Sequence, residues 1–326
     1  MRGRLLSRKL RLRGPALALL TLLAPACTPQ DEPLPLEQGG FPPPAEGAER
    51  WQTPELLVPA GSERFWCMAG TLPDDVGVDA LWQWTDSRWM HHQLVKRAPP
   101  DLPYEDGEVV DCLDLGEWWG PAPTLFEGVG DLDDEDEREV ALPPGSAFLI
   151  QAGQRFVFDS HFVNTGEEDE YAVVAVDMHF VDPSTVEHPV GSFNHDVGGG
   201  LLIPPGLHTE TFDCVWEQDV SLLALGPHMH DHGREYSIDL VSPDGTVERL
   251  VHVDPWDPDF LDEPPMRYFA LGELPIAQGQ AFRTTCTWDN DSGHDLGFPD
   301  EMCTTFGVAA GLLESLLCEP QGPPPQ

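Results

Sequence analysis

Short runs of alternating or β-branched residues recur along this chain, separated by turns rich in proline, glycine and aspartate. The clearest runs are residues 155–162, 171–181, 220–225 and 235–241. Alternation with a period of two is typical of strands with one buried face. The one candidate for a helical turn is residues 312–317. The pattern therefore predicts an all-β fold made of sandwiches or jelly rolls.

Composition divides the chain into a body and two flanks. Residues 28–52 are rich in proline, glycine and glutamate, which predicts a disordered tether, and residues 319–326 predict a similar tail. The body between them is longer than one typical domain of about 100 to 150 residues. Glycines and prolines cluster between positions 188 and 205. We therefore expect two jelly-roll-like β-sandwich domains in tandem, residues 53–196 and 197–318.

The N-terminus has the character of an export signal. A basic start is followed by the apolar stretch 15–26 and then by Cys27. This stretch is shorter than the roughly 20 apolar residues that cross a bilayer, so residues 1–27 are interpreted as a signal peptide. Ala24 and Ala26 before Cys27 resemble a bacterial lipobox, which predicts a lipidated Cys27 and a cell-envelope lipoprotein, facing the periplasm or on the cell surface. An ordinary signal peptide and a freely secreted product is the alternative.

Charge and cysteine content agree with export. The formal net charge is −40, and six of the 17 basic residues lie in the expected leader. Such an acidic chain repels nucleic acid, so no nucleic-acid partner is expected, and the membrane contact is expected through the lipid anchor alone. Six cysteines besides Cys27 predict three disulfides, which persist in an oxidising compartment, and the sequence leaves fifteen pairings open. The sequence contains no CxxC spacing, so the cysteines are not expected to bind metal.

Histidines are the candidate metal ligands. His228 and His230 alternate, so in a strand both would lie on one face as a chelating pair. His91 and His92 are adjacent and would point to opposite faces of a regular strand. They need a twisted strand or different ring nitrogens to bind one ion.

His161 lies in the run 155–162. Phe156, Phe158 and Phe162 alternate with it and are expected in the core, which leaves His161 on the other face with Val157 and Asp159. His232 would join His228 and His230 only if the strand continued to it, and Gly233 suggests that the strand ends there.

The order of these motifs carries a family resemblance. The chain contains Met-His-His at 90–92, His-Phe-Val-Asn at 161–164, Ile-Pro-Pro-Gly at 203–206, His-Met-His-Asp-His-Gly at 228–233 and Glu-Met-Cys at 301–303. This series resembles the copper type II, ascorbate-dependent monooxygenases, the family of peptidylglycine α-hydroxylating monooxygenase and dopamine β-hydroxylase. The resemblance covers roughly residues 64–318.

The resemblance implies two jelly-roll-like domains with one copper in each. His91, His92 and His161 would hold an electron-transfer copper. His228, His230 and Met302 would hold the catalytic copper, where a soft thioether favours Cu(I). An ascorbate-like reductant and O2 would then serve to hydroxylate a C–H bond of a small-molecule or peptide substrate.

The resemblance also selects one pairing of the cysteines, namely Cys67–Cys112, Cys214–Cys318 and Cys286–Cys303. It departs from the peptide-amidating enzyme at two positions. Gly226 stands where that enzyme has an arginine that binds the substrate carboxylate, and Phe306 stands where it has a tyrosine. Peptide amidation is therefore not expected. Near the catalytic motif, Asp231 and His232 are candidates for outer-shell support, and Arg234 is expected at the surface.

Two other functions fit the same residues. A non-enzymatic copper-binding lipoprotein of the envelope would keep all six ligands, and a β-sandwich binding module would have its histidines by accident. Oxygen uptake with ascorbate separates the enzyme from the copper carrier. Copper stoichiometry separates both from the binding module.

Overall fold

Strands account for nearly all regular structure in the computed structural model, which describes residues 40–119, 124–129, 137–196, 200–261, 264–298 and 300–318. The expected leader with Cys27, most of the expected tether and the tail 319–326 lie outside these residues. Within the described ranges, no helix combines the length and the apolar character that crossing a membrane would need.

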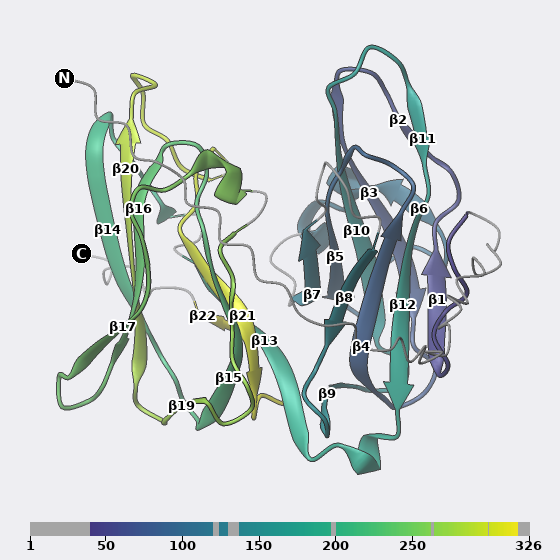
Figure 1. Ribbon diagram of the computed structural model, residues 1–326. Coiled ribbons are helices and arrows are strands. Elements are labelled where there is room, and N and C mark those ends of the chain that lie inside the picture. The colour runs from purple at the N-terminus through teal and green to yellow at the C-terminus, as the bar shows by residue number, and fades with distance from the viewer. Residues whose placement is uncertain are drawn as a thin grey trace, which may run out of the picture. The chain divides into compact units, whose positions relative to one another are not determined.

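The first sandwich pairs a five-stranded sheet with part of a larger sheet (Figure 1). The five-stranded sheet has the order β6 (Val109–Asp111), β3 (Ser62–Thr71), β10 (Arg155–Asn164), β5 (Met90–Ala98) and β7 (Thr124–Val129). Facing it are β1 (Ala48–Gln52), β12 (Val174–Val181), β4 (Val76–Thr85) and β9 (Ser146–Ile150), with β8 (Glu137–Ala141) on β4. A small pair, β2 (Leu56–Val58) and β11 (Glu170–Ala172), and the 3-10 helices η1 (Cys112–Trp119) and η2 (Pro183–Thr185) complete this half.

Alternation along β10 explains how the core of this sandwich forms. Phe156 and Phe158 lie on one face and pack with side chains of β4 and β12, such as Leu81 and Met178, from the opposing sheet. Val157 lies on the other face of β10 in a separate cluster. β10 is a central strand with both faces buried, which places His161 in a buried position as well.

The second sandwich is built in the same way. Its four-stranded sheet has the order β14 (Gly206–Val215), β20 (Ala281–Asn290), β16 (Gly233–Val241) and β17 (Val247–Val253). Across the core lie β13 (His188–Asp196), β21 (Thr304–Ala310) and β15 (Val220–His228), with the short strands β18 (Arg267–Tyr268), β19 (Leu274–Ile276) and β22 (Leu316–Cys318) at their edges and the 3-10 helix η4 (Pro258–Leu261) nearby. Trp216, Trp288, Tyr236 and Phe282 fill the space between the sheets.

β13 belongs to both halves. Its first residues pair in parallel with β9, and most of its length pairs antiparallel with β21. Val190 packs in the core of the first sandwich and Phe193 in the core of the second. The expected domain boundary after residue 196 therefore follows a strand that both sandwiches share, and the described residues form one compact unit.

The predicted fold class is confirmed: the chain is all-β, with two jelly-roll-like sandwiches in tandem that disulfides staple. The disulfides are Cys67–Cys112, Cys214–Cys318 and Cys286–Cys303, the pairing that the family resemblance implies. Several disulfides in one chain indicate an extracytoplasmic protein.

Two expectations about the flanks of the body are wrong. The expected tether does not extend to residue 52, because β1 pairs with β12 over Ala48–Gln52 and Phe41 is buried. Arg50 binds Asp177 through two hydrogen bonds of 2.7 Å, and the ring of Trp51 packs edge-on against Phe156. These contacts outweigh the polar composition around them.

Residues 312–317 do not form the expected helical turn. They form a bend that leads into β22. β22 pairs in parallel with β13, and Cys318 at its end is bonded to Cys214. Sheet pairing and the disulfide therefore decide the conformation of a segment whose leucines suggest a helix.

Candidate metal centres

The three predicted histidines of the first sandwich lie together on β5 and β10. One ligand atom from each of His91, His92 and His161 lies within 4.8 Å of the other two. A β-bulge makes this arrangement possible. His161 pairs with His92 and Phe162 pairs with Met90, so His91 is the extra residue of β5. A bulge redirects a side chain, and here it removes the obstacle that adjacent histidines of a regular strand face opposite ways.

The ring nitrogens are arranged as ligands of one ion would be. Nδ1 of His91 and Nδ1 of His92 are 3.2 Å apart. Two nitrogens bound at about 2.0 Å to one metal ion lie about 3 Å apart. Nδ1 of His161 is buried and has no hydrogen-bond partner among the described residues. A buried nitrogen without a partner is costly in a folded protein, and a bound metal ion would satisfy it.

The opposite edge of the His161 ring is held by Glu63. Nε2–H of His161 donates to Oε1 of Glu63 at 2.7 Å, and the ring stacks on Phe65 with centroids 3.9 Å apart. Because a carboxylate can only accept this bond, the proton of neutral His161 lies on Nε2 and the lone pair lies on Nδ1. A carboxylate that orients a metal-binding imidazole in this way is a recurrent support of metal sites.

Burial keeps the imidazoles of His92 and His161 neutral. Burial lowers the pKa of His92 well below 6.5, and the neighbouring His161 lowers it further. Burial also lowers the pKa of His161 to about 4, assisted by His91 and opposed by the hydrogen bond to Glu63. Neutral imidazole is the form that binds a metal ion, so a metal would meet little competition from protons at neutral pH.

The histidines of the second sandwich lie where β15 ends. His228 is the last residue of β15, and His230 lies in the connection to β16, with the fully buried Met229 between them. Their rings are 5.1 Å apart and nearly perpendicular. The strand stops before His230, yet His228 and His230 are both half-buried on either side of Met229. The two imidazoles therefore keep the common orientation that alternation predicts.

A backbone carbonyl fixes the ring of His230. Nδ1 of His230 lies 3.2 Å from the carbonyl oxygen of Asp300. A carbonyl can only accept, so Nδ1 carries the proton and Nε2 keeps its lone pair. His232 lies beyond the strand and pairs with Asp291 at 3.3 Å, while Asp231 and Arg234 are exposed.

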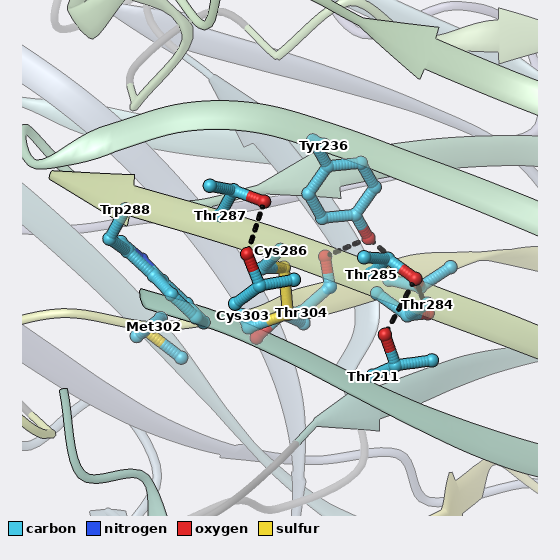
Figure 2. The surroundings of a disulfide bond; sticks show 12 residues. Thr211, Tyr236, Thr284, Thr285, Cys286, Thr287, Trp288, Met302, Cys303 and Thr304 are labelled. Atoms are coloured by element: carbon cyan, nitrogen blue, oxygen red, sulfur yellow. Dashed lines mark hydrogen bonds between the residues drawn. A yellow bond between two sulfur atoms is a disulfide. The ribbon is translucent and has the colours of Figure 1, made fainter. Parts of the chain in front are cut away.

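Met302 lies just before β21, at the end of the segment that follows β20. It precedes Cys303, whose disulfide to Cys286 joins the start of β21 to β20 (Figure 2). The backbone N–H groups of His230 and Met302 both donate to Oε2 of the buried Glu301, at 3.1 and 3.3 Å. Backbone hydrogen bonds therefore tie the residues that bear the predicted thioether and the predicted imidazole to the same carboxylate. Glu301 begins the Glu-Met-Cys motif that predicts Met302 as a ligand, but the sequence predicts no role for Glu301 itself.

Apolar side chains enclose the position two residues before His228. Gly226 lies two residues before His228 on the same face of β15, and a Cβ at Gly226 would overlap the thioether of Met266 and the ring of Phe306. Phe306, on β21, is the strand-pairing partner of Gly226 on β15. A side chain at position 226 would therefore have to displace Met266 and Phe306.

Three other groups in the described residues have the composition of a metal site. Two of them contain disulfide-bonded cysteines, Cys214–Cys318 beside His195 and Cys67–Cys112 beside Asp159, whose sulfurs are not thiolate ligands. The third is an exposed group of Glu235, His252 and Asp254. Of these groups, the imidazole cluster of the first sandwich has the strongest metal-binding character.

Comparisons with known proteins find solved structures that match this chain at low identity and low TM-score. No family model matches this sequence, and no curated protein matches it. The major capsid protein P2 of bacteriophage PM2 has a TM-score of 0.39 and 10% identity, over 81% of this chain and 97% of its own. PBCV-1 VP54, fitted into a reconstruction of the virophage Sputnik, has a TM-score of 0.27 and 8% identity, over 80% of this chain and 93% of its own. The ANX2 ectodomain of Arabidopsis thaliana has a TM-score of 0.22 and 8% identity, over 89% and 97%.

Proposed function

We propose that this chain is a copper-dependent monooxygenase that binds one copper at each histidine site. The observation that carries the proposal is the convergence of the ligand atoms of His91, His92 and His161 around the unpartnered Nδ1 of His161. Three imidazoles suit copper in both oxidation states. The second set, His228, His230 and Met302, adds a thioether, which suits Cu(I).

Copper, when bound, would supply the one-electron and O2 chemistry of the reaction. One oxygen atom of O2 enters a C–H bond of the substrate, and the other leaves as water with two protons. The two electrons come from a reductant of the ascorbate class.

In this proposal, the residues of the chain bind the two coppers and orient the imidazoles that hold them. Glu63 holds the proton of His161 on Nε2, and the carbonyl of Asp300 holds the proton of His230 on Nδ1, so that each ring offers the other nitrogen. Gly226, Met266 and Phe306 form an apolar group two residues before His228 on β15. This group favours an uncharged part of the substrate at the second site.

The first test is the copper content of the chain purified from the envelope, together with oxygen uptake in the presence of ascorbate. We expect two coppers per wild-type chain, one in His161→Ala and a weakened Cu(I) site in Met302→Ala. His208→Ala, on β14 and paired with Glu210, is the matched control and keeps both coppers. Substrate screening then follows oxygen from ¹⁸O2 into uncharged C–H substrates. Absence of copper overturns the proposal.

A copper carrier is the second candidate, and it is favoured by the thioether of Met302, which would also suit storage of Cu(I). It predicts two coppers per chain and no oxygen uptake with ascorbate above that of free copper. The same experiment therefore separates it from the enzyme.

We also propose that Cys27 carries the lipid that anchors this protein to a bacterial envelope membrane. The test is fractionation of cells that express wild type or Cys27→Ala. We expect wild type in the membrane fraction and the variant in the soluble envelope fraction or the medium. Equal release of both proteins would instead support the freely secreted product.

A further inference from the structure

Glu301 is a buried carboxylate whose partners are all hydrogen-bond donors. Its exposed fraction is 0%. Oε1 accepts the backbone N–H of His232 at 2.7 Å. Oε2 accepts the backbone N–H of His230 at 3.1 Å, Nε1–H of Trp288 at 3.1 Å and the backbone N–H of Met302 at 3.3 Å. In the described part of the chain, these partners are neutral N–H groups and none is a cation.

Such an arrangement matches an ionised carboxylate. A buried charge is tolerated when several hydrogen bonds replace its water, and bonds to a charged acceptor are stronger than bonds between neutral groups. A protonated carboxyl group would need an acceptor for its own proton, and these four partners supply none. Glu301 therefore brings one uncompensated negative charge into the second sandwich.

The four donors come from three separate parts of the chain. His230 and His232 lie in the connection from β15 to β16, Trp288 lies on β20, and Met302 precedes β21. No backbone strand pairing joins His230 to Met302. Glu301 instead bonds to the backbone of both residues, and the carbonyl of Asp300 binds the ring of His230, so together they limit how the imidazole and the thioether can approach each other.

We propose that Glu301 is the positioning residue and the counter-charge of the second metal site. It holds the connection that bears His230 against the segment that bears Met302, and its negative charge stabilises a cation bound by them. The inference rests on the proposed function, because it assumes that His228, His230 and Met302 bind copper. It adds an electrostatic role that the ligands themselves do not have.

The negative charge makes a prediction with a definite sign. A nearby negative charge stabilises Cu(II), with two positive charges, more than Cu(I), with one. Glu301→Gln keeps the size of the side chain and removes the charge. It should therefore weaken Cu(II) binding more than Cu(I) binding and raise the reduction potential of the site. A tenfold change in the ratio of the two affinities corresponds to 59 mV for a one-electron couple.

The experiment measures Cu(I) and Cu(II) affinities and the potential of the second site in a His161→Ala background, which leaves this site alone to bind copper. For Glu301→Gln we expect the ratio of Cu(II) to Cu(I) affinity to fall at least tenfold, with partial rescue in Glu301→Asp. Asp177→Asn is the matched control. Asp177 is also a buried carboxylate that accepts a tryptophan N–H, from Trp84 at 2.8 Å, but it lies in the first sandwich.

Trp288→Phe keeps the inference testable if Glu301→Gln does not fold. It removes one donor and leaves the carboxylate less neutralised, so the potential should move the opposite way and fall. Copper binding with unchanged potentials in Glu301→Gln, or in Trp288→Phe where only that variant folds, overturns this inference and leaves the proposed function standing. A wild-type chain that binds no copper overturns both.

Discussion

The two histidine sites are built by different means. In the first sandwich, neighbouring strands β5 and β10 bring the imidazoles together, and the bulge at His91 aims the third ring. In the second, one candidate ligand ends a strand, one lies in a connection and one precedes another strand, and the buried Glu301 bonds to the backbone of the latter two. The first site depends on strand register, and the second depends on a side chain that bonds to backbone.

The carboxylates that support the sites also differ. Glu63 binds the ring of His161 directly and has 58% of its side chain exposed, whereas Glu301 is fully buried and binds backbone N–H groups. The first site offers Nδ1 of His161 because Glu63 binds Nε2, and the second offers Nε2 of His230 because the carbonyl of Asp300 binds Nδ1. Removal of Glu63 should therefore loosen one ligand, while removal of Glu301 should disturb two.

The largest expected effect comes from His161→Ala. It removes one of three imidazoles, and loss of a direct ligand should cost more than the roughly 10- to 100-fold that loss of an outer-shell partner costs. We expect metal affinity at the first site to fall by more than about 100-fold, measured by competition with a chelator. The second site should keep its affinity. Equal weakening of both sites would show that they are one unit rather than two.

Removal of the Cys286–Cys303 disulfide tests the other half of the comparison. The bridge closes a loop with a sequence separation of 17 residues, and a loop of that size stabilises by about 3 kcal/mol in the chain-entropy model. Cys286→Ser with Cys303→Ser should lower the free energy of unfolding by about that amount and weaken the site of Met302. The first site is the internal control, and metal loss there would contradict the independence of the two sites.

Glu63→Gln should have a smaller effect confined to the first site. The neutral amide would not hold the proton of His161 on Nε2 as a carboxylate does, so we expect metal affinity there to fall by about 10- to 100-fold. Glu210→Gln, at a similar histidine pair on the surface, is the control. A loss in Glu210→Gln as large as that in Glu63→Gln would mean that charge in general, rather than this hydrogen bond, supports the site.

His195 sharpens the comparison because it is a buried histidine without neighbouring imidazoles. Burial lowers its pKa to about 4, and its Nδ1 lies 3.2 Å from Oγ1 of Thr284. Below pH 6.5 the unfolded chain binds a proton that folded His195 does not, so stability is full above pH 6.5 and falls as the pH drops towards 4. The loss should be about 2 kcal/mol at pH 5, since each pKa unit is worth about 1.4 kcal/mol.

Urea unfolding of the metal-free chain from pH 7 to pH 4 measures this loss. His195→Gln keeps a polar group opposite Thr284 and does not titrate, so its stability should fall less steeply over the same range. If the two proteins lose stability equally, burial of His195 is not the source of the pH dependence.

Alternation along the sequence was sufficient for the clearest strands, whereas the grouping of His91, His92 and His161 was implied by the family resemblance. Alternation predicts β10, β15 and β16, and the His-x-His spacing predicts the shared orientation of His228 and His230. The sequence by itself could not reveal the bulge at His91, because a bulge depends on the register between β5 and its partner strand β10. The same limit applies to β1, whose polar composition hides the contacts of Arg50 and Trp51.

Glu301 shows another limit of sequence reasoning. As one of many acidic residues in an acidic chain, it carries no local signal that separates it from those at the surface. Its role appears only when the connection after β15 folds against β20 and its donors come together.

The bulge on β5 has a consequence for how such a site is gained or lost in evolution. Met90 before it and Val95 after it face the same aromatic side of β10, although one position is even and the other odd. One inserted codon therefore adds a ligand while the core residues on both sides keep their places. Deletion of that codon would remove the bulge and one candidate ligand, while the side chains on both sides keep their faces. The first candidate metal site could therefore be gained or lost without repacking its sandwich.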